Sequence, residues 1–271
     1  MSRVGIPESM LPKAMTLLSL ERMAIFKSIA GDEHHAIILH HQMLNTSAAL
    51  MPIIAMLEIC LRNEVYERLS GMFGNPDWLQ DPPLPFIWRD QERNAIRKAI
   101  GQARRAAYGK QRHYQKKQLD NIAFPNGLPN TLRHKDRVKR RQSSIQITIG
   151  QLIAQLTLAF WKRLFSTDYE AALWERTLKK IFPDKRLGRA KIAENLEVIY
   201  QVRNRIAHHE PLYGERLTSV VDSIEFIVSR FGDKIDGKQT LLEIMTKTQR
   251  ECLYVEIAKL AEMLSTFEVS G

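Results

Sequence analysis

The sequence predicts an all-α protein. Apolar residues recur at spacings of three and four along most of the 271 residues, which is the pattern of helices packed on one face. No stretch shows the sustained alternation of apolar and polar residues between glycine or asparagine turns that strands would show. The composition, 44% hydrophobic and 26% charged, is that of an ordinary globular protein and excludes disorder throughout.

Two helices and a loop are expected at the N-terminal end. One helix should span about 7–30, and a longer one should follow over about 33–71. Pro52 lies inside the longer helix and should kink or briefly break it, because proline lacks the backbone donor. The prolines of 74–85 predict a loop.

The rest of the chain is expected to continue as helices with one irregular span. The span contains two prolines and an Asn-Gly pair, which favour turns over regular structure. In chain order we expect a basic helix, the irregular span, three further helices and a C-terminal helix, at 90–114, 118–140, 143–165, 168–181, 187–210 and around 253–264.

The net charge of +10 comes from one block of the chain. Residues 89–141 hold sixteen lysines and arginines against four acids, a net charge of +12, while the remainder carries −2. Such a block favours a polyanionic partner, because each cation that meets a phosphate releases a condensed counterion. A solvated basic face without a partner explains the charge equally well. Interleaved rings favour RNA or another single strand, and they belong to Tyr108, His113, Tyr114 and Phe124.

Nine basic residues of this block are predicted to contact RNA. They are Arg104, Arg105, Arg112, Lys116, Lys117, Arg137, Lys139, Arg140 and Arg141.

One short stretch carries side chains typical of catalytic sites. Arg203, Asn204, Arg205, His208 and His209 occupy the last turns before Pro211, and the proline predicts that the helix ends at about 210. On an ideal helix Asn204 and His208 share a face and Arg205 and His209 share the next. Arg203 and His208 lie about 140° apart. One helix therefore aims them poorly at a single atom, and the ordinary alternative is ion pairs and carbonyl caps.

The string RNRIAHHEPL, residues 203–212, resembles the Arg-Asn-x-x-x-His signature of HEPN-superfamily ribonucleases. It is similar in particular to the Abi-like abortive-infection family of bacterial defence proteins. Further landmarks of that family occur in the same order between about Ser19 and Tyr213. They are Leu57-Glu58, Leu61-Arg62-Asn63, Phe73-Gly74, Trp78, Phe160-Trp161, Leu164-Phe165, Trp174 and Phe182-Pro183.

The resemblance implies a HEPN-type helical bundle that forms one domain over 1–271, with 89–141 as a basic insertion. It also implies a metal-independent RNA endonuclease, a toxin or phage-defence effector without cofactor, that cuts by attack of the ribose 2′-OH on its own phosphate. Arg203 would stabilise the phosphate charge, Asn204 would orient the phosphate or the imidazole, and His208 would act as general acid or base. The chain holds one such motif, so the composite site of the family implies a homodimer.

Supporting roles at the site are expected for His209 and Arg205 and, on the long helix, for Glu58, Arg62 and Asn63. The alternative for Glu58 and Arg62 is a buried structural ion pair. Tyr213 either lines the site or packs under it, and packing is favoured. Trp78, Trp161 and Trp174 are expected to anchor the core.

No metal site is predicted. His34, His35, His40 and His41 suggest one, but none of their separations is the four residues that ligand pairs on a helix prefer, so they are expected on the helix surface. Two isolated cysteines and the absence of a signal peptide or a 20-residue apolar run favour a cytoplasmic protein without a membrane partner. The second function considered is a non-catalytic RNA-binding or toxin-neutralising protein. A regulatory RNA or antitoxin would be a further partner.

Overall fold

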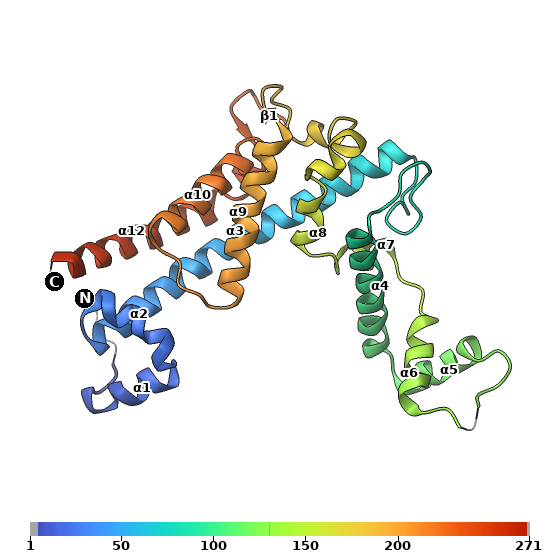
Figure 1. The fold of residues 1–271 in the computed structure, drawn as a ribbon, viewed down its shortest axis with the longest axis horizontal. Helices are drawn as coiled ribbons and strands as arrows, with labels where there is room; N and C mark the ends of the chain where they lie inside the picture. The colour runs from blue at the N-terminus through green and yellow to red at the C-terminus, as the bar shows by residue number, and fades with distance from the viewer. Residues whose placement is uncertain (1–4, 130, 270–271) are drawn as a thin grey trace. The chain divides into compact units, whose positions relative to one another are not determined.

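The computed structural model describes residues 5–129 and 131–269, and over these ranges the all-α prediction is confirmed (Figure 1). The chain divides into two compact units. The first unit is built from 1–60 and 182–271, and the second from 61–181. The basic segment 89–141 lies within the second unit, whereas residues 203–209 lie within the first.

The first unit consists of helices with one small hairpin. Its elements are η1 (Glu8–Met10), α1 (Leu11–Leu17), α2 (Leu20–Ala30), the part of α3 (Glu33–Phe73) up to residue 60, α9 (Arg189–Ala207), α10 (Gly214–Val228), β1 (Lys234–Ile235), β2 (Gln239–Thr240), α11 (Leu241–Met245) and α12 (Lys247–Val269). The two strands pair antiparallel, and both Asp236 and Gly237 of their turn have positive φ angles.

The second unit holds the remainder of α3 and shorter helices. These are α4 (Asp90–Lys110), α5 (His113–Ala123), α6 (His134–Ser143), α7 (Ile149–Ile153), α8 (Leu158–Arg163), η2 (Thr167–Tyr169), the π-helix η3 (Glu170–Trp174) and η4 (Leu178–Ile181). An aromatic cluster forms much of its core. Trp78, Trp161 and Trp174 are buried, as predicted.

Helix α3 runs without a break through Pro52, contrary to the expected interruption. Proline costs one hydrogen bond, but its neighbours Leu50, Ile53 and Ile54 are buried and hold the backbone helical. By length and composition alone, α3 is apolar enough to cross a membrane. A buried core helix satisfies the same criterion, and we interpret α3 as a core helix because its apolar residues pack inside the fold.

The helix predicted over 7–30 is in fact interrupted. Ser19 adopts a φ of 75°, which no helical residue does, and separates α1 from α2. Leu17 and Leu20 on either side are 80% and 61% exposed. Met15, Met23 and Phe26 are buried farther along the two helices, but the two leucines beside the break make no buried contact that would favour a continuous helix.

The predictions for 90–181 are wrong in several boundaries. The basic helix ends at Lys110, and α5 and α6 occupy most of the span predicted to be irregular. The helix expected over 143–165 is two short ones, α7 and α8, and that over 168–181 is three single turns. One carboxylate explains why α5 and α6 form in the span that was predicted to be irregular. Asp120 of α5 accepts hydrogen bonds from Arg137 and Arg141 of α6, which holds the two helices together.

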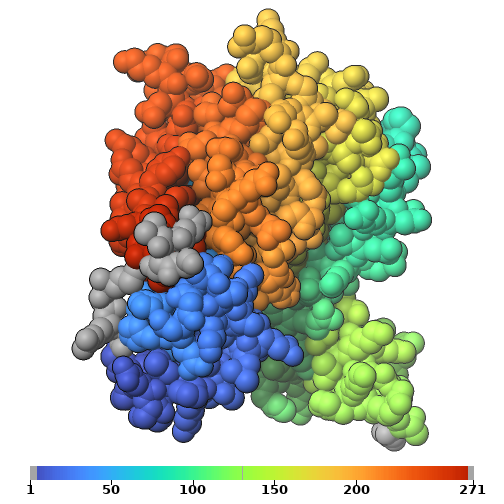
Figure 2. Space-filling model, turned by 60° about the vertical axis from the view of Figure 1, so that its left-hand side comes forward, coloured from blue at the N-terminus to red at the C-terminus, as the bar shows by residue number. Residues whose placement is uncertain are grey.

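In the first unit, α10 packs along α9 and α12 packs on α2 (Figure 1). One stripe of α9 is buried, including Ile192, Leu196, Ile199 and Ile206, as the spacing predicts. The end of α9 and its connection to α10 lie at the molecular surface, next to the N-terminal helices (Figure 2). In this arrangement 208–210 are exposed, whereas Arg203, Asn204 and Arg205 are half-buried.

Candidate functional site

The last turn of α9 ends in a hydrogen-bonded cap. The helix ends at Ala207, and His208 is the first residue beyond it, with its N–H bonded to the carbonyls of Asn204 and Arg205. His209 has a φ of 56°, and the N–H of Glu210 donates to the Arg205 carbonyl at 3.0 Å. This is a Schellman cap, in which glycine is usual at the position of His209. The cap ends the helix three residues before the predicted boundary.

The three predicted catalytic residues belong to the last turn of α9 and its cap. Arg203 and Asn204 are half-buried, and His208 is exposed. An Arg203 guanidinium nitrogen donates to Oδ1 of Asn204 at 3.5 Å. Within the described residues Arg203 forms no ion pair, so its positive charge remains available to an anion.

Arg205, unlike Arg203, forms an ion pair among the described residues. Its guanidinium pairs with the Glu210 carboxylate at 2.7 Å, which confirms the ordinary ion-pair interpretation for this residue. The pair links the last turn of α9 to the segment beyond it. Arg205 Nε is buried without a hydrogen-bond partner among the described residues.

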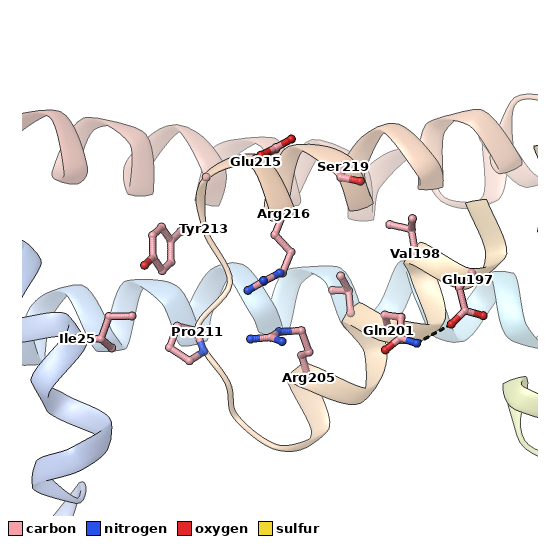
Figure 3. Close-up of a pocket in the computed structure, with 12 residues that line it drawn as sticks. Ile25, Glu197, Val198, Gln201, Arg205, Pro211, Tyr213, Glu215, Arg216 and Ser219 are labelled. Atoms are coloured by element: carbon pink, nitrogen blue, oxygen red, sulfur yellow. Dashed lines mark hydrogen bonds between the residues drawn. The ribbon is translucent and has the colours of Figure 1, made fainter. Parts of the chain in front are cut away.

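A groove of about 800 Å³ runs between α9 and α10 and is shown in Figure 3. Arg205 and Arg216 point into the same space from the two helices, with Pro211 beside them. Tyr213 is half-buried and also lines the groove. Two guanidinium groups facing one open groove suit the binding of phosphate.

Three residues near the motif were not predicted to lie there. Arg22 of α2 donates to the carbonyl of His209 at 3.3 Å, Arg216 lines the groove, and His40 of α3 is buried. The prediction that His40 is a surface residue is wrong. Its ring packs edge-on against Phe26, with centroids 5.0 Å apart, because this side of α3 faces α2.

On α3 the alternative of a structural ion pair between Glu58 and Arg62 is not observed among the described residues. Arg62 Nε is buried without a partner among these residues. Asn63 is exposed. Glu58 belongs to the first unit, whereas Arg62 and Asn63 belong to the second, and their supporting roles stay predictions.

The basic segment divides into structural and exposed cations. Arg141 is buried and, with Arg137, binds the Asp120 carboxylate, and these hydrogen bonds hold the pKa of Asp120 well below its usual range. We therefore assign both arginines to structure, because burial leaves Arg141 little surface for a phosphate. Arg104 donates to the Ile145 carbonyl.

The remaining predicted RNA contacts are at the surface. Arg105, Arg112, Lys117, Lys139 and Arg140 are exposed, and the Lys116 ammonium lies 4.9 Å from the centroid of the Tyr108 ring. Of the rings expected to stack on bases, Phe124 is buried and covered by the Arg140 guanidinium. Tyr114, in contrast, is exposed and available for stacking.

Within the described residues, no group of three or more His, Cys, Asp or Glu side chains lies close enough to hold a metal ion. No protein-family model, curated protein or solved structure matches the chain. The geometry of the site therefore carries the functional argument.

His209→Gly is expected to stabilise the protein by about 1 kcal/mol. A residue with a Cβ is strained in the left-handed region and glycine is not, although glycine also gains entropy in the unfolded chain. Urea unfolding of the full chain measures the change. The control is Ala207→Gly, which should destabilise because Ala207 is helical. Destabilisation by His209→Gly would show that contacts of the His209 side chain outweigh the backbone strain.

Reversing four exposed charges of the basic segment should weaken RNA binding. The variant carries glutamate at Arg105, Lys117, Lys139 and Arg140, and leaves Asp120 with both of its arginines. The slope of log K against log salt should fall by up to about 3, since each contact to a single strand contributes about 0.7. The matched control replaces four exposed cations outside the segment, Lys179, Lys180, Lys185 and Arg186. Equal slopes for the two variants would move the RNA surface elsewhere.

Proposed function

We propose that the protein is a metal-independent RNA endonuclease of the HEPN type, acting as a toxin or phage-defence effector in the cytoplasm. The observation that carries this proposal is the end of α9. Arg203, which forms no ion pair among the described residues, and Asn204 belong to its last turn, and His208 to its cap. Arg205 of the same turn lines a groove together with Arg216.

The chemistry needs one acid–base group and one cation. His208 takes the proton of the ribose 2′-OH, the 2′ oxygen bonds to the adjacent phosphorus, and the bond from phosphorus to the 5′ oxygen breaks. A protonated imidazole returns a proton to that leaving oxygen. The products are a 2′,3′-cyclic phosphate and a 5′-OH. Arg203 stabilises the negative charge that grows on the phosphate oxygens, and Asn204, which accepts its hydrogen bond, orients it.

The site is completed in a homodimer. The angle of about 140° between Arg203 and His208 on one helix separates the cation from the acid–base group. A second copy related by a two-fold axis places its own histidine opposite Arg203, and each α9 end contributes to the same phosphate.

Light scattering of the full chain at micromolar concentration should therefore give twice the mass of one chain. Cleavage by a protein that stays strictly monomeric would contradict the composite site. Activity recovered by mixing inactive Arg203→Ala and His208→Ala chains would support it, because one heterodimer site keeps both groups.

Expression in cells tests the function itself. Cells producing the wild-type protein should stop growing and accumulate RNA with new 5′-OH ends, whereas cells producing His208→Ala should do neither. Normal growth and unchanged RNA ends with a folded wild-type protein would contradict the proposal.

A second candidate is a non-catalytic RNA-binding or toxin-neutralising protein, favoured by one observation. The exposed cations of 89–141 suit RNA whether or not turnover follows. Tight, salt-dependent binding of RNA that is never cut by the purified protein would favour this candidate. A regulatory RNA or an antitoxin that co-purifies would identify a further partner.

A further inference from the structure

A second, smaller hollow adjoins the groove at the end of α9. Its volume is about 290 Å³, at the lower end of the range for ligand pockets. It is lined by Phe26 of α2, by His40, Met43 and Ser47 of α3, and by Ile206 and His209. Pro211 lines both the groove and this pocket, so the two meet at the segment that follows the motif.

The wall of the pocket is mostly apolar, with Ser47, His209 and Glu210 as further polar residues, and it contains one buried side chain whose nitrogen lacks a partner. His40 is 4% exposed, and its Nδ1 has no hydrogen-bond partner among the described residues. Burial lowers the pKa of His40, and the nearby His41 and Arg22 act in the same direction. The imidazole is therefore neutral at pH 7. A neutral ring offers a hydrogen-bonding nitrogen without the cost of a buried charge.

We propose that this pocket binds one nucleobase of the RNA, a role that rests on the proposed function. A base is planar and carries polar groups on its edge, and enzymes bind such unstacked bases between apolar or aromatic side chains. Here Phe26, Met43 and Ile206 would contact the base, and the His40 ring, whose Nδ1 is covered in the free protein, would turn to hydrogen-bond to the edge of the base. The adjoining phosphate would lie in the groove, at Arg205 and Arg216.

Nucleotide binding tests the pocket without any cleavage. Titration calorimetry with each of the four nucleoside 5′-monophosphates is carried out on the full chain and on His40→Phe, which keeps the size of the ring but removes its nitrogens. We expect at least one nucleotide to bind the wild type and to bind His40→Phe at least about tenfold more weakly. The matched control is His41→Phe, an exposed neighbouring imidazole outside the pocket, which should change nothing.

Ala48→Leu is a second variant that tests the pocket even if His40→Phe does not fold. Ala48 lines the same pocket but is exposed on α3, so a larger side chain there should block entry without disturbing the core. Unfolding curves confirm that each variant is folded. Two results would overturn the proposed nucleobase pocket. Either both folded variants bind every nucleotide as tightly as the wild type does, or no nucleotide binds the wild type or any variant.

Cleavage separates the pocket from the proposed function. If the wild type cuts RNA, the bases next to the new 5′-OH ends should be biased, and His40→Phe should remove the bias. An unchanged bias would overturn the pocket and leave the nuclease intact. Nucleotide binding that depends on His40 in a protein that never cuts RNA would overturn the nuclease instead.

Discussion

Replacing His208 with alanine is expected to slow RNA cleavage by about 10² to 10⁴-fold, because a positioned acid–base group contributes that much. Arg203→Ala should cost about 10² to 10³-fold, since the guanidinium is aimed at charge that develops only in the transition state. The rate at which a short single-stranded RNA yields 5′-OH ends measures both effects.

Both side chains belong to a partly exposed turn, so neither substitution should unfold the protein. Thermal unfolding and the dimer mass provide that control. His209→Ala should be milder, because His208, and not His209, stands four residues after Asn204 and so lies over it. Loss of activity in His209→Ala with full activity in His208→Ala would show that the other histidine carries the chemistry.

An RNA with 2′-deoxy or 2′-O-methyl ribose at the scissile nucleotide should not be cut at that position. The proposed nucleophile is the 2′ oxygen, and either change removes its ionisable proton or the oxygen itself. Mass spectrometry of the products from unmodified RNA should find the 2′,3′-cyclic phosphate on the upstream fragment.

The unmodified RNA should be cut at the same rate with and without EDTA. Imidazole and guanidinium perform the proton transfer and charge stabilisation that a metal ion would otherwise supply. For the modified RNAs, a separate measurement of how tightly the 2′-O-methyl RNA binds the protein shows whether resistance to cleavage comes from weaker binding. Magnesium-dependent cleavage that leaves a 3′-OH would contradict the mechanism.

Sequence periodicity predicted the long helices and failed at the short ones. The stripe of α9 and the apolar run of α3 are continuous, so their helices were found within a few residues. The break at Ser19 depends on a backbone angle that no spacing reveals. Asp236-Gly237 is a typical hairpin signal, but the two strands that it joins have two residues each and are too short to show alternation.

The candidate site was predictable only where it is contiguous in sequence. Arg203, Asn204 and His208 stand within six positions, and their spacing shows which of them share a turn. Arg22, Arg216 and His40 come from three other helices, and only the packing of those helices brings them near the motif. No feature of the sequence distinguishes Arg22 or Arg216 from other charged residues, and His40 stands out only as one of four clustered histidines.

Charge counts have a similar limit. Arg141 looks like its neighbours Lys139 and Arg140 in a sequence, yet it is buried against a carboxylate twenty-one residues away. A count measures the total charge of a segment. Which cations remain free for an anion depends on ion pairs that form only when α5 and α6 pack.

The cap at the end of α9 has a consequence for engineering. A sequence chosen for thermal stability alone would place glycine or asparagine at 209, where the backbone is left-handed. Selection of variants by melting temperature should therefore favour loss of an imidazole that borders the nucleobase pocket. Thermostabilised variants of this protein should be screened for nucleotide binding as well as for stability, because His209 lines the proposed pocket.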